Sequence, residues 1–338
     1  MKVKEKQSQF SPNNERIKYK YRIHVKRAIK KDSKTIIAEL KYLREYELFD
    51  NFAGFENFNS TRADKFINYL FDQKYSISYI NDTLRTLKVF LTWLERQKGF
   101  RSKINYNDID YLNITNNQRR AAKATEHKKS YSFDQIVKTI RQMPDKTMIN
   151  RRDKAIISAN ALCSLRISEL RTIKLKNLIE EDGKLFIHIN PKDISAKFAK
   201  ARYADCAALP QDIFDNLINW KSELVKLGFT SKDPLFPKIP SNFNQFNLLE
   251  SKISKEEIKS GSQMRDIFKN AFQKAGLEYI NPHNFRHTRA RFASKQSPEY
   301  LNATRQTMGQ KNIDTTLGSY GELSMDEQRD IIAGIKII

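Results

Sequence analysis

The sequence is poor in cysteine and has no long apolar run. Its two cysteines, Cys163 and Cys206, stand in apolar surroundings without a neighbour at metal-binding spacing, which predicts reduced core thiols and argues against a zinc site. No segment approaches the roughly 20 apolar residues of a membrane span. The basic N-terminus lacks the apolar core of a signal peptide. We therefore expect a cytoplasmic location, no membrane association and no metal.

Motifs for nucleotides and catalytic metals are also missing. There is no GxxxxGK[ST] loop for phosphates and no GxGxxG segment after a predicted strand. No cluster of Asp and Glu has the spacing of a two-metal site of the polymerase or nuclease kind. We expect no cofactor, and phosphoryl chemistry in this chain has to proceed without metal or ATP.

The sequence has a large excess of positive charge. Its 61 Lys and Arg against 39 Asp and Glu give a net charge of +22 and a pI near 9.8. This excess indicates a polyanionic partner, with nucleic acid as the first candidate, and association with the bacterial nucleoid. The 39% hydrophobic and 11% aromatic content argues against general disorder, and 338 residues suffice for one large or two ordinary domains.

The N-terminal third divides into a basic segment and a helical domain. Residues 1–35 are rich in Lys and Arg with little apolar periodicity, which fits either a solvated, partly disordered tail or an arm along the DNA backbone. Residues 36–112 show helical periodicity and predict a compact all-α domain. The clearest apolar stripe spans four turns and ends before Gly99; its members are Ile80, Leu84, Leu87, Leu91 and Leu94.

The remaining chain predicts a linker and a second domain. Residues 113–130 are Asn-rich, then basic, and we interpret them as the linker. Residues 131–338 predict helices, beginning with one capped by Ser132, and a single β-hairpin made by 184–190 and 201–210. The expected fold is therefore mainly α with a small β-hairpin or sheet.

Two arginines suit a site that grips a phosphodiester. Arg166 follows the apolar run ANALCSL, where an unpaired cation is costly, and Glu169 is placed to hold its guanidinium. Arg286 falls in the first turn of a helix opened by Asn284, where free N–H groups favour a phosphate. Arginine binds oxygens bidentately and does not deprotonate. Most single arginines are surface or structural residues, so the pattern matters more than either one.

A histidine and a tyrosine could supply the chemistry. His283 precedes the helix of Arg286 and could hydrogen-bond a phosphate or take a proton; as a lone loop histidine it could also be inert. Tyr320 lies between Gly318 and Gly321 near the C-terminus. Its phenol could attack a phosphate if neighbouring cations assist it, whereas a tyrosine taken alone is more often a core or surface residue.

These segments, in this order, carry a resemblance. LCSLRISEL, the lysine-bearing hairpin, HNFRH and MGQKNIDTTLGSYG resemble the signature boxes of the tyrosine recombinase (phage integrase) family over residues 130–322, and 36–100 resembles its core-site DNA-binding domain more loosely. The resemblance implies a two-domain DNA clamp with a helical core-binding domain and a catalytic domain. It also implies a homo-tetramer on double-stranded DNA with inverted core-site repeats. The activity implied is integration and excision of a mobile genetic element by DNA recombination.

The resemblance also implies residue roles. Tyr320 would form a 3′-phosphotyrosine intermediate and free a 5′-hydroxyl, while Arg166, Arg286 and His283 would match the family's phosphate-binding residues. Lys197 best matches the general acid for the leaving oxygen, because AKFAKAR fits a Lys-x-x-Lys-x-Arg run into the second strand; Lys192 and Lys200 remain open.

One position departs from the family pattern. Gln310 stands where the family usually has His or Trp, and glutamine can donate a hydrogen bond to phosphate but cannot shuttle a proton. Reduced or retuned activity is expected. The alternatives left open are a resolvase of chromosome or plasmid dimers, a topoisomerase of related chemistry, and a non-cleaving DNA-binding protein of the same fold.

Overall fold

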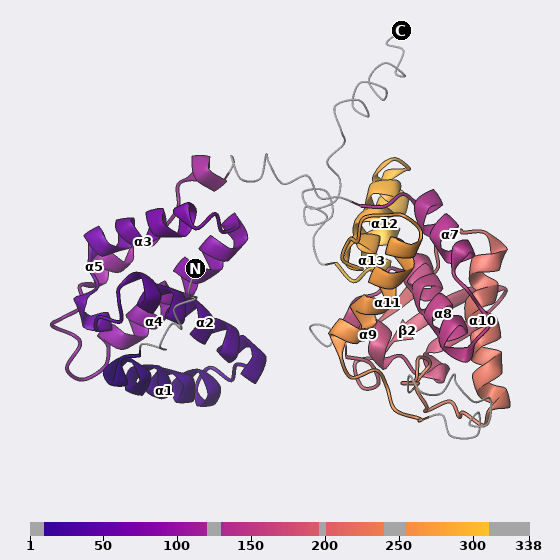
Figure 1. Cartoon of the computed structure of the whole chain (residues 1–338), viewed down its shortest axis with the longest axis horizontal. Coiled ribbons are helices and arrows are strands. Elements are labelled where there is room, and N and C mark those ends of the chain that lie inside the picture. Colours follow the sequence, from indigo (N-terminus) through magenta and orange to yellow (C-terminus); the bar gives the residue numbers. More distant parts are fainter. Residues whose placement is uncertain (1–9, 120–129, 196–200, 240–253, 311–338) are drawn as a thin grey trace, which may run out of the picture. The chain divides into compact units, whose positions relative to one another are not determined.

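The computed structural model describes residues 10–119, 130–195, 201–239 and 254–310. The chain divides into two compact units, Met1–His127 and Lys128–Ile338, which are treated separately below (Figure 1). Each has its own hydrophobic core: one cluster runs from Ile17 to Ile114 and the other from Tyr131 to Phe285.

The first unit is helical throughout its described part. Tyr46 lies at the centre of its aromatic core and meets Phe66 edge-on with ring centroids 5.1 Å apart, while Phe55 meets Phe90 at 4.7 Å. Such aromatic pairs add to the stabilisation that burial alone provides. The helices are α1 (Pro12–Arg27), α2 (Ser33–Phe49), η1 (Phe55–Asn57), α3 (Ser60–Asp72), α4 (Ile77–Glu95) and α5 (Tyr106–Ile109).

The basic N-terminal segment differs from the expected tail or arm. Residues 12–27 form α1, which begins at the cap residue Ser11 and buries Ile17, Tyr21 and Val25 in the core of the first unit. Its Lys18 ion-pairs at 2.6 Å with the fully buried carboxylate of Glu47 on α2. The three apolar residues lie four positions apart, so one face of a strongly basic helix is enough to dock it.

The predicted stripe of α4 is confirmed, since Ile80, Leu84, Leu87, Leu91 and Leu94 are all buried. The core of this unit also takes in Ile17 of α1 and, beyond the predicted boundary at residue 112, Ile114. The N-terminal domain is therefore larger on both sides than the 36–112 segment that periodicity indicates.

The second unit is mainly helical and is built around α8, whose residues from Ala155 to Cys163 are all buried. α10 packs against α8, and α13 packs against both α12 and β3. Its elements are α7 (Phe133–Gln142), α8 (Met148–Cys163), α9 (Ile167–Thr172), η2 (Leu175–Asn177), β1 (Leu178–Glu181), β2 (Lys184–Ile189), β3 (Arg202–Asp205), α10 (Gln211–Lys226), α11 (Gly261–Lys274), α12 (Asn284–Ser294) and α13 (Pro298–Thr307). Figure 1 shows α12 and α13 together at one side of this unit.

The sheet has three antiparallel strands in the order β1-β2-β3, one more than the predicted hairpin. β1 joins β2 through Asp182 and Gly183, both at positive φ (49° and 70°), as a tight hairpin turn requires. In the β2–β3 pair Ile189 lies opposite Arg202, so the end of β2 and the start of β3 are adjacent. This pairing places Arg202 at the beginning of β3, directly after the predicted lysine loop.

The two cysteines lie together in this unit. The Sγ atoms of Cys163, at the end of α8, and Cys206, just after β3, are 3.3 Å apart and both thiols are free. The hydrogen bond with Cys163 and burial raise the pKa of the Cys206 thiol far above its ordinary value. Both cysteines therefore pack as free thiols in this unit, as the sequence predicts.

Candidate active site

Arg166 is held where the buried helix α8 ends. Ser164 caps α8 in the left-handed conformation (φ 49°), which turns the chain so that Arg166 becomes the N-cap of α9. Its guanidinium donates to Oε1 of Glu169 at 2.8 Å, and its backbone N–H donates to Oε2 at 2.9 Å. The predicted contact between Arg166 and Glu169 is confirmed, and the arginine side chain remains 20% exposed.

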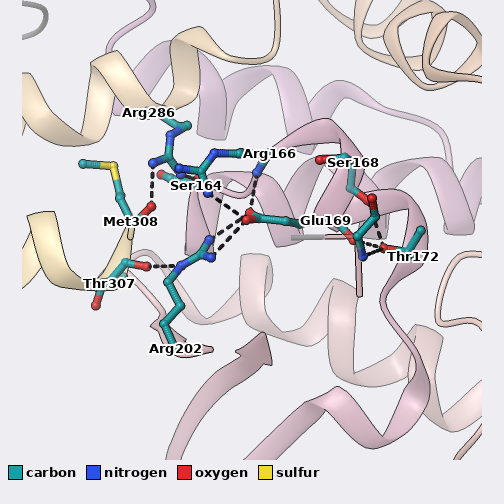
Figure 2. A network of polar contacts seen from close by, with 10 residues as sticks. Ser164, Arg166, Ser168, Glu169, Thr172, Arg202, Arg286, Thr307 and Met308 are labelled. Atoms are coloured by element: carbon teal, nitrogen blue, oxygen red, sulfur yellow. Dashed lines mark hydrogen bonds and ion pairs between the residues drawn. The ribbon is translucent and has the colours of Figure 1, made fainter. Parts of the chain in front are cut away.

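Glu169 joins two arginines. Its buried carboxylate also accepts from both terminal nitrogens of Arg202, Nη1 at 3.0 Å and Nη2 at 2.8 Å (Figure 2). Burial alone raises the pKa of Glu169, but the hydrogen bonds and charge of Arg202, together with those of Arg166, hold that pKa below its usual value. Glu169 is therefore an anion that fixes two cations.

Arg286 occupies the first turns of α12 and is only 1% exposed. Its guanidinium donates to the carbonyl of Ser164 at 2.8 Å and to the carbonyl of Met308 at 2.6 Å (Figure 2). The first carbonyl lies two residues before Arg166. The second lies two residues before Gln310. The structure thus brings three predicted segments, far apart in the chain, to one place.

Two arginines that sequence reasoning did not single out support this arrangement. Arg202 donates from Nε to the carbonyl of Thr307 at 2.9 Å, beside the carbonyl that Arg286 holds. Arg289, one turn after Arg286, is buried and donates from one nitrogen to the carbonyls of Leu162 and Asp205. The sequence signal for Arg289 was its helical spacing from Arg286. Arg202 stands out in the sequence only as the last residue of the AKFAKAR segment.

The other predicted residues are placed as follows. His283 is exposed at the N-cap of α12, with its ring centroid 5.7 Å from that of His287. Gln310 is 8% exposed; its backbone N–H donates to the carbonyl of Arg305, and Arg305 donates back to the carbonyl of Gln310 at 3.1 Å. Lys192 is exposed just after β2. Tyr320, Lys197 and Lys200 lie outside the described residues.

The arrangement suits an oxyanion. Arg166 presents a partly exposed cation whose geometry is set by hydrogen bonds, and a preset cation stabilises developing negative charge without reorganisation.

Within the described ranges, no three His, Cys, Asp or Glu side chains gather as a metal site. In the same ranges, helices long and apolar enough to cross a membrane are absent.

Known proteins resemble this chain in sequence and in fold. Residues 130–327 match the model of the phage integrase family. A probable integrase/recombinase of Aquifex aeolicus (strain VF5) is 25% identical over 89% of this chain and 94% of the relative. A Tn1549 transposon integrase in complex with transposon right end DNA has a TM-score of 0.63 at 16% identity, over 94% of this chain and 98% of that one. A lambda integrase tetramer bound to a Holliday junction has a TM-score of 0.60 at 16% identity, over 89% and 78%.

The mainly helical fold with its small antiparallel sheet, together with the family match, defines a tyrosine recombinase catalytic domain. The chain belongs to the phage integrase family, as its matched segment covers more than half of its length. The resemblance predicted from the four sequence motifs is thereby confirmed.

Proposed function

We propose that the protein cleaves and rejoins DNA at specific sites to integrate and excise a mobile genetic element. The observation that carries this is the hydrogen bond from Arg286 to the carbonyl of Ser164, a residue 122 positions earlier in the chain. This bond holds Arg286 next to the segment in which Arg166 pairs with Glu169. A phosphodiester held there would have its charge balanced as the bond breaks. The Tn1549 transposon integrase is in complex with transposon right end DNA, which supports the mobile-element role.

In the proposed reaction the Tyr320 oxygen attacks the scissile phosphorus as His283 takes the phenol proton. The bond to the 5′-oxygen breaks, leaving a 3′-phosphotyrosine and a 5′-hydroxyl after Lys197 donates a proton. Lys192 and Lys200 are the alternative donors. Arg166 and Arg286 hold the non-bridging oxygens, and the exposed His283 and the buried Gln310 add hydrogen bonds. Rejoining reverses these steps on a second strand, and the energy of the broken bond is kept in the phosphotyrosine.

The assembly proposed for this reaction is a homo-tetramer on two DNA duplexes with inverted core-site repeats. The lambda relative forms a tetramer on a Holliday junction, which supports this assembly. In it, the first and second units of each chain hold opposite sides of one duplex as a clamp. The net charge of +22 favours such wrapping, and the protein would act in the cytoplasm on the nucleoid.

The test is formation of a covalent adduct. Duplexes carrying the DNA that flanks the gene, nicked beside the scissile phosphate so that the 5′-hydroxyl fragment diffuses away, are incubated with wild-type protein and separated in SDS. Wild type should form an SDS-resistant adduct, Tyr320→Phe should form none, and Tyr300→Phe, at an exposed tyrosine of α13, should match wild type.

The adduct test also separates the alternatives. A wild-type protein that binds these duplexes but forms no adduct is a non-cleaving DNA-binding protein, the outcome that Gln310 makes worth testing. Adducts at inverted repeats unconnected with element ends would indicate a resolvase. Relaxation of supercoils without a specific site would indicate a topoisomerase.

A further inference from the structure

Arg202 contacts two segments of the site and is itself almost covered, with a side chain 7% exposed. It donates to both oxygens of Glu169 and to the carbonyl of Thr307. We propose that Arg202 is a positioning residue for strand cleavage. It offsets the negative charge of Glu169, so that Arg166 keeps a net positive charge for the phosphate, and it fixes the position of the turn before Gln310. This inference rests on the proposed function of the site.

The first argument is charge balance. Glu169 would by itself neutralise Arg166, since their ion pair is short (2.8 Å) and the carboxylate is fully buried. Arg202 adds a second cation to the same carboxylate, through a bidentate pair at 3.0 and 2.8 Å. Two guanidinium groups on one carboxylate leave a net positive charge. Because Arg202 is covered and Arg166 is partly exposed, that charge is available to a phosphate at Arg166.

The second argument is geometry. Arg202 holds the carbonyl of Thr307 and Arg286 holds the next carbonyl, that of Met308, so two arginines from different elements fix one turn (Figure 2). Gly309 follows at φ +64°, and a Cβ there would lie 2.9 Å from Cδ of Arg202. The glycine therefore allows the arginine to lie against the turn that carries Gln310.

If Arg202 served only as a structural salt bridge, its loss would lower the stability of the domain without a specific loss of cleavage. Loss of a buried pair destabilises a domain wherever the pair lies. Arg152 supplies the comparison, because it is also buried in this unit and donates to the Pro237 carbonyl at 3.1 Å and to Asp153 at 2.7 Å. Arg152→Met should lower the melting temperature of the full-length protein without changing cleavage well below that temperature.

The test measures single-turnover cleavage of the nicked element-end duplex by wild type, Arg202→Met, Arg202→Lys and Arg152→Met. Each protein is also given a duplex with a neutral methylphosphonate at the scissile position, where the non-bridging oxygen develops one negative charge fewer for the arginines to balance. We expect Arg202→Met to slow phosphodiester cleavage by about 100-fold, as for a lost oxyanion donor. DNA affinity of this variant should stay within about threefold of that of wild type, since the covered side chain of Arg202 does not itself bind the DNA backbone.

Two further readouts identify positioning. Methylphosphonate cleavage by Arg202→Met should fall by less than about tenfold, because a misplaced cation matters less when the reacting group carries one negative charge fewer. Arg202→Lys keeps the charge that offsets Glu169 but loses the planar fork, so it should recover about tenfold of the lost rate. This lysine variant also keeps the test open if the methionine variant does not fold.

The outcomes are distinguishable. Absence of an adduct with wild type on the phosphodiester overturns the proposed function. If wild type cleaves, the positioning role is overturned by an Arg202 variant that cleaves the phosphodiester within threefold of wild type, or by one that slows both substrates equally. Selective loss on the phosphodiester with partial recovery by lysine supports it.

Discussion

The site depends on Glu169, whose carboxylate accepts four hydrogen bonds from Arg166 and Arg202. Its folded pKa lies below its ordinary value of 4.5 because the arginine contacts outweigh burial. A depressed pKa stabilises the folded state at pH above 4.5, and that stabilisation is lost as pH falls through the folded pKa. The second unit should therefore lose stability as the pH falls below 4.5, where Glu169 begins to take up a proton on unfolding.

Glu169→Gln tests this dependence. The amide cannot offset the charges of Arg166 and Arg202, so the free energy of unfolding of the second unit should fall by about 3 kcal/mol at neutral pH. The difference between variant and wild type should shrink as pH drops below 4.5, since wild type then loses the same anion. Denaturant unfolding at several pH values measures both effects.

Asp212→Asn is the control for that experiment. Asp212 pairs with Arg141 at the surface, and hydrogen bonding to that arginine lowers its pKa, but both side chains are about half exposed. Solvent screens such a pair, so its loss should change stability much less than the loss of Glu169. An equal effect of the two substitutions would contradict the role given to the buried carboxylate.

At this scale the sequence predicts single residues better than their partners. Arg166 and Glu169 stand out because a charged residue beside a buried run requires a neighbour, and Arg286 stands out because it lies in the first turn of a predicted helix. The role of Arg202 depends on contacts with Glu169 and Thr307, 33 and 105 residues away, which no local pattern contains. Tyr320 and Lys197 remain predictions from the motif and from the family.

Among the elements, α1 is where sequence and structure differ most. Its charges conceal an apolar face of only three residues, Ile17, Tyr21 and Val25, which is not evident until α2 and α4 cover it. β1 was missed for a related reason: Leu178–Glu181 is short and only partly alternating, although the Asp182-Gly183 pair is a strong hairpin signal. Long stripes such as α4 were predicted because their periodicity suffices by itself.

The packing of α1 gives a direct test. Tyr21 is 1% exposed and meets Phe90 and Trp93 with ring centroids 5.1 and 5.2 Å apart, whereas Tyr19 on the same helix is 61% exposed. Tyr21→Ala should lower the free energy of unfolding of the first unit by about 3 kcal/mol, as expected for a buried aromatic. Tyr19→Ala should change it by less than about 0.5 kcal/mol. If the two substitutions lowered the free energy of unfolding in urea by similar amounts, α1 would not be packed against the first unit but would be a loose arm.

For the whole molecule, two separate cores imply two cooperative units. The clusters Ile17–Ile114 and Tyr131–Phe285 each bury their own apolar residues, so neither needs the other to exclude water. Calorimetry of the free protein should show two transitions. Tyr21→Ala should lower only one of them and Glu169→Gln only the other, which assigns each transition to its unit.

DNA should then couple the two transitions if both units hold one duplex. A ligand that binds only the folded state raises the melting temperature of whatever it binds, so a duplex carrying the element end should raise both transitions together. The excess positive charge of the chain makes this shift sensitive to salt, because each phosphate contact releases counterions. Raising the salt concentration should reduce both shifts in parallel. A duplex that raises only the transition assigned by Glu169→Gln would contradict the clamp, because the first unit would then be free of DNA while the second is bound.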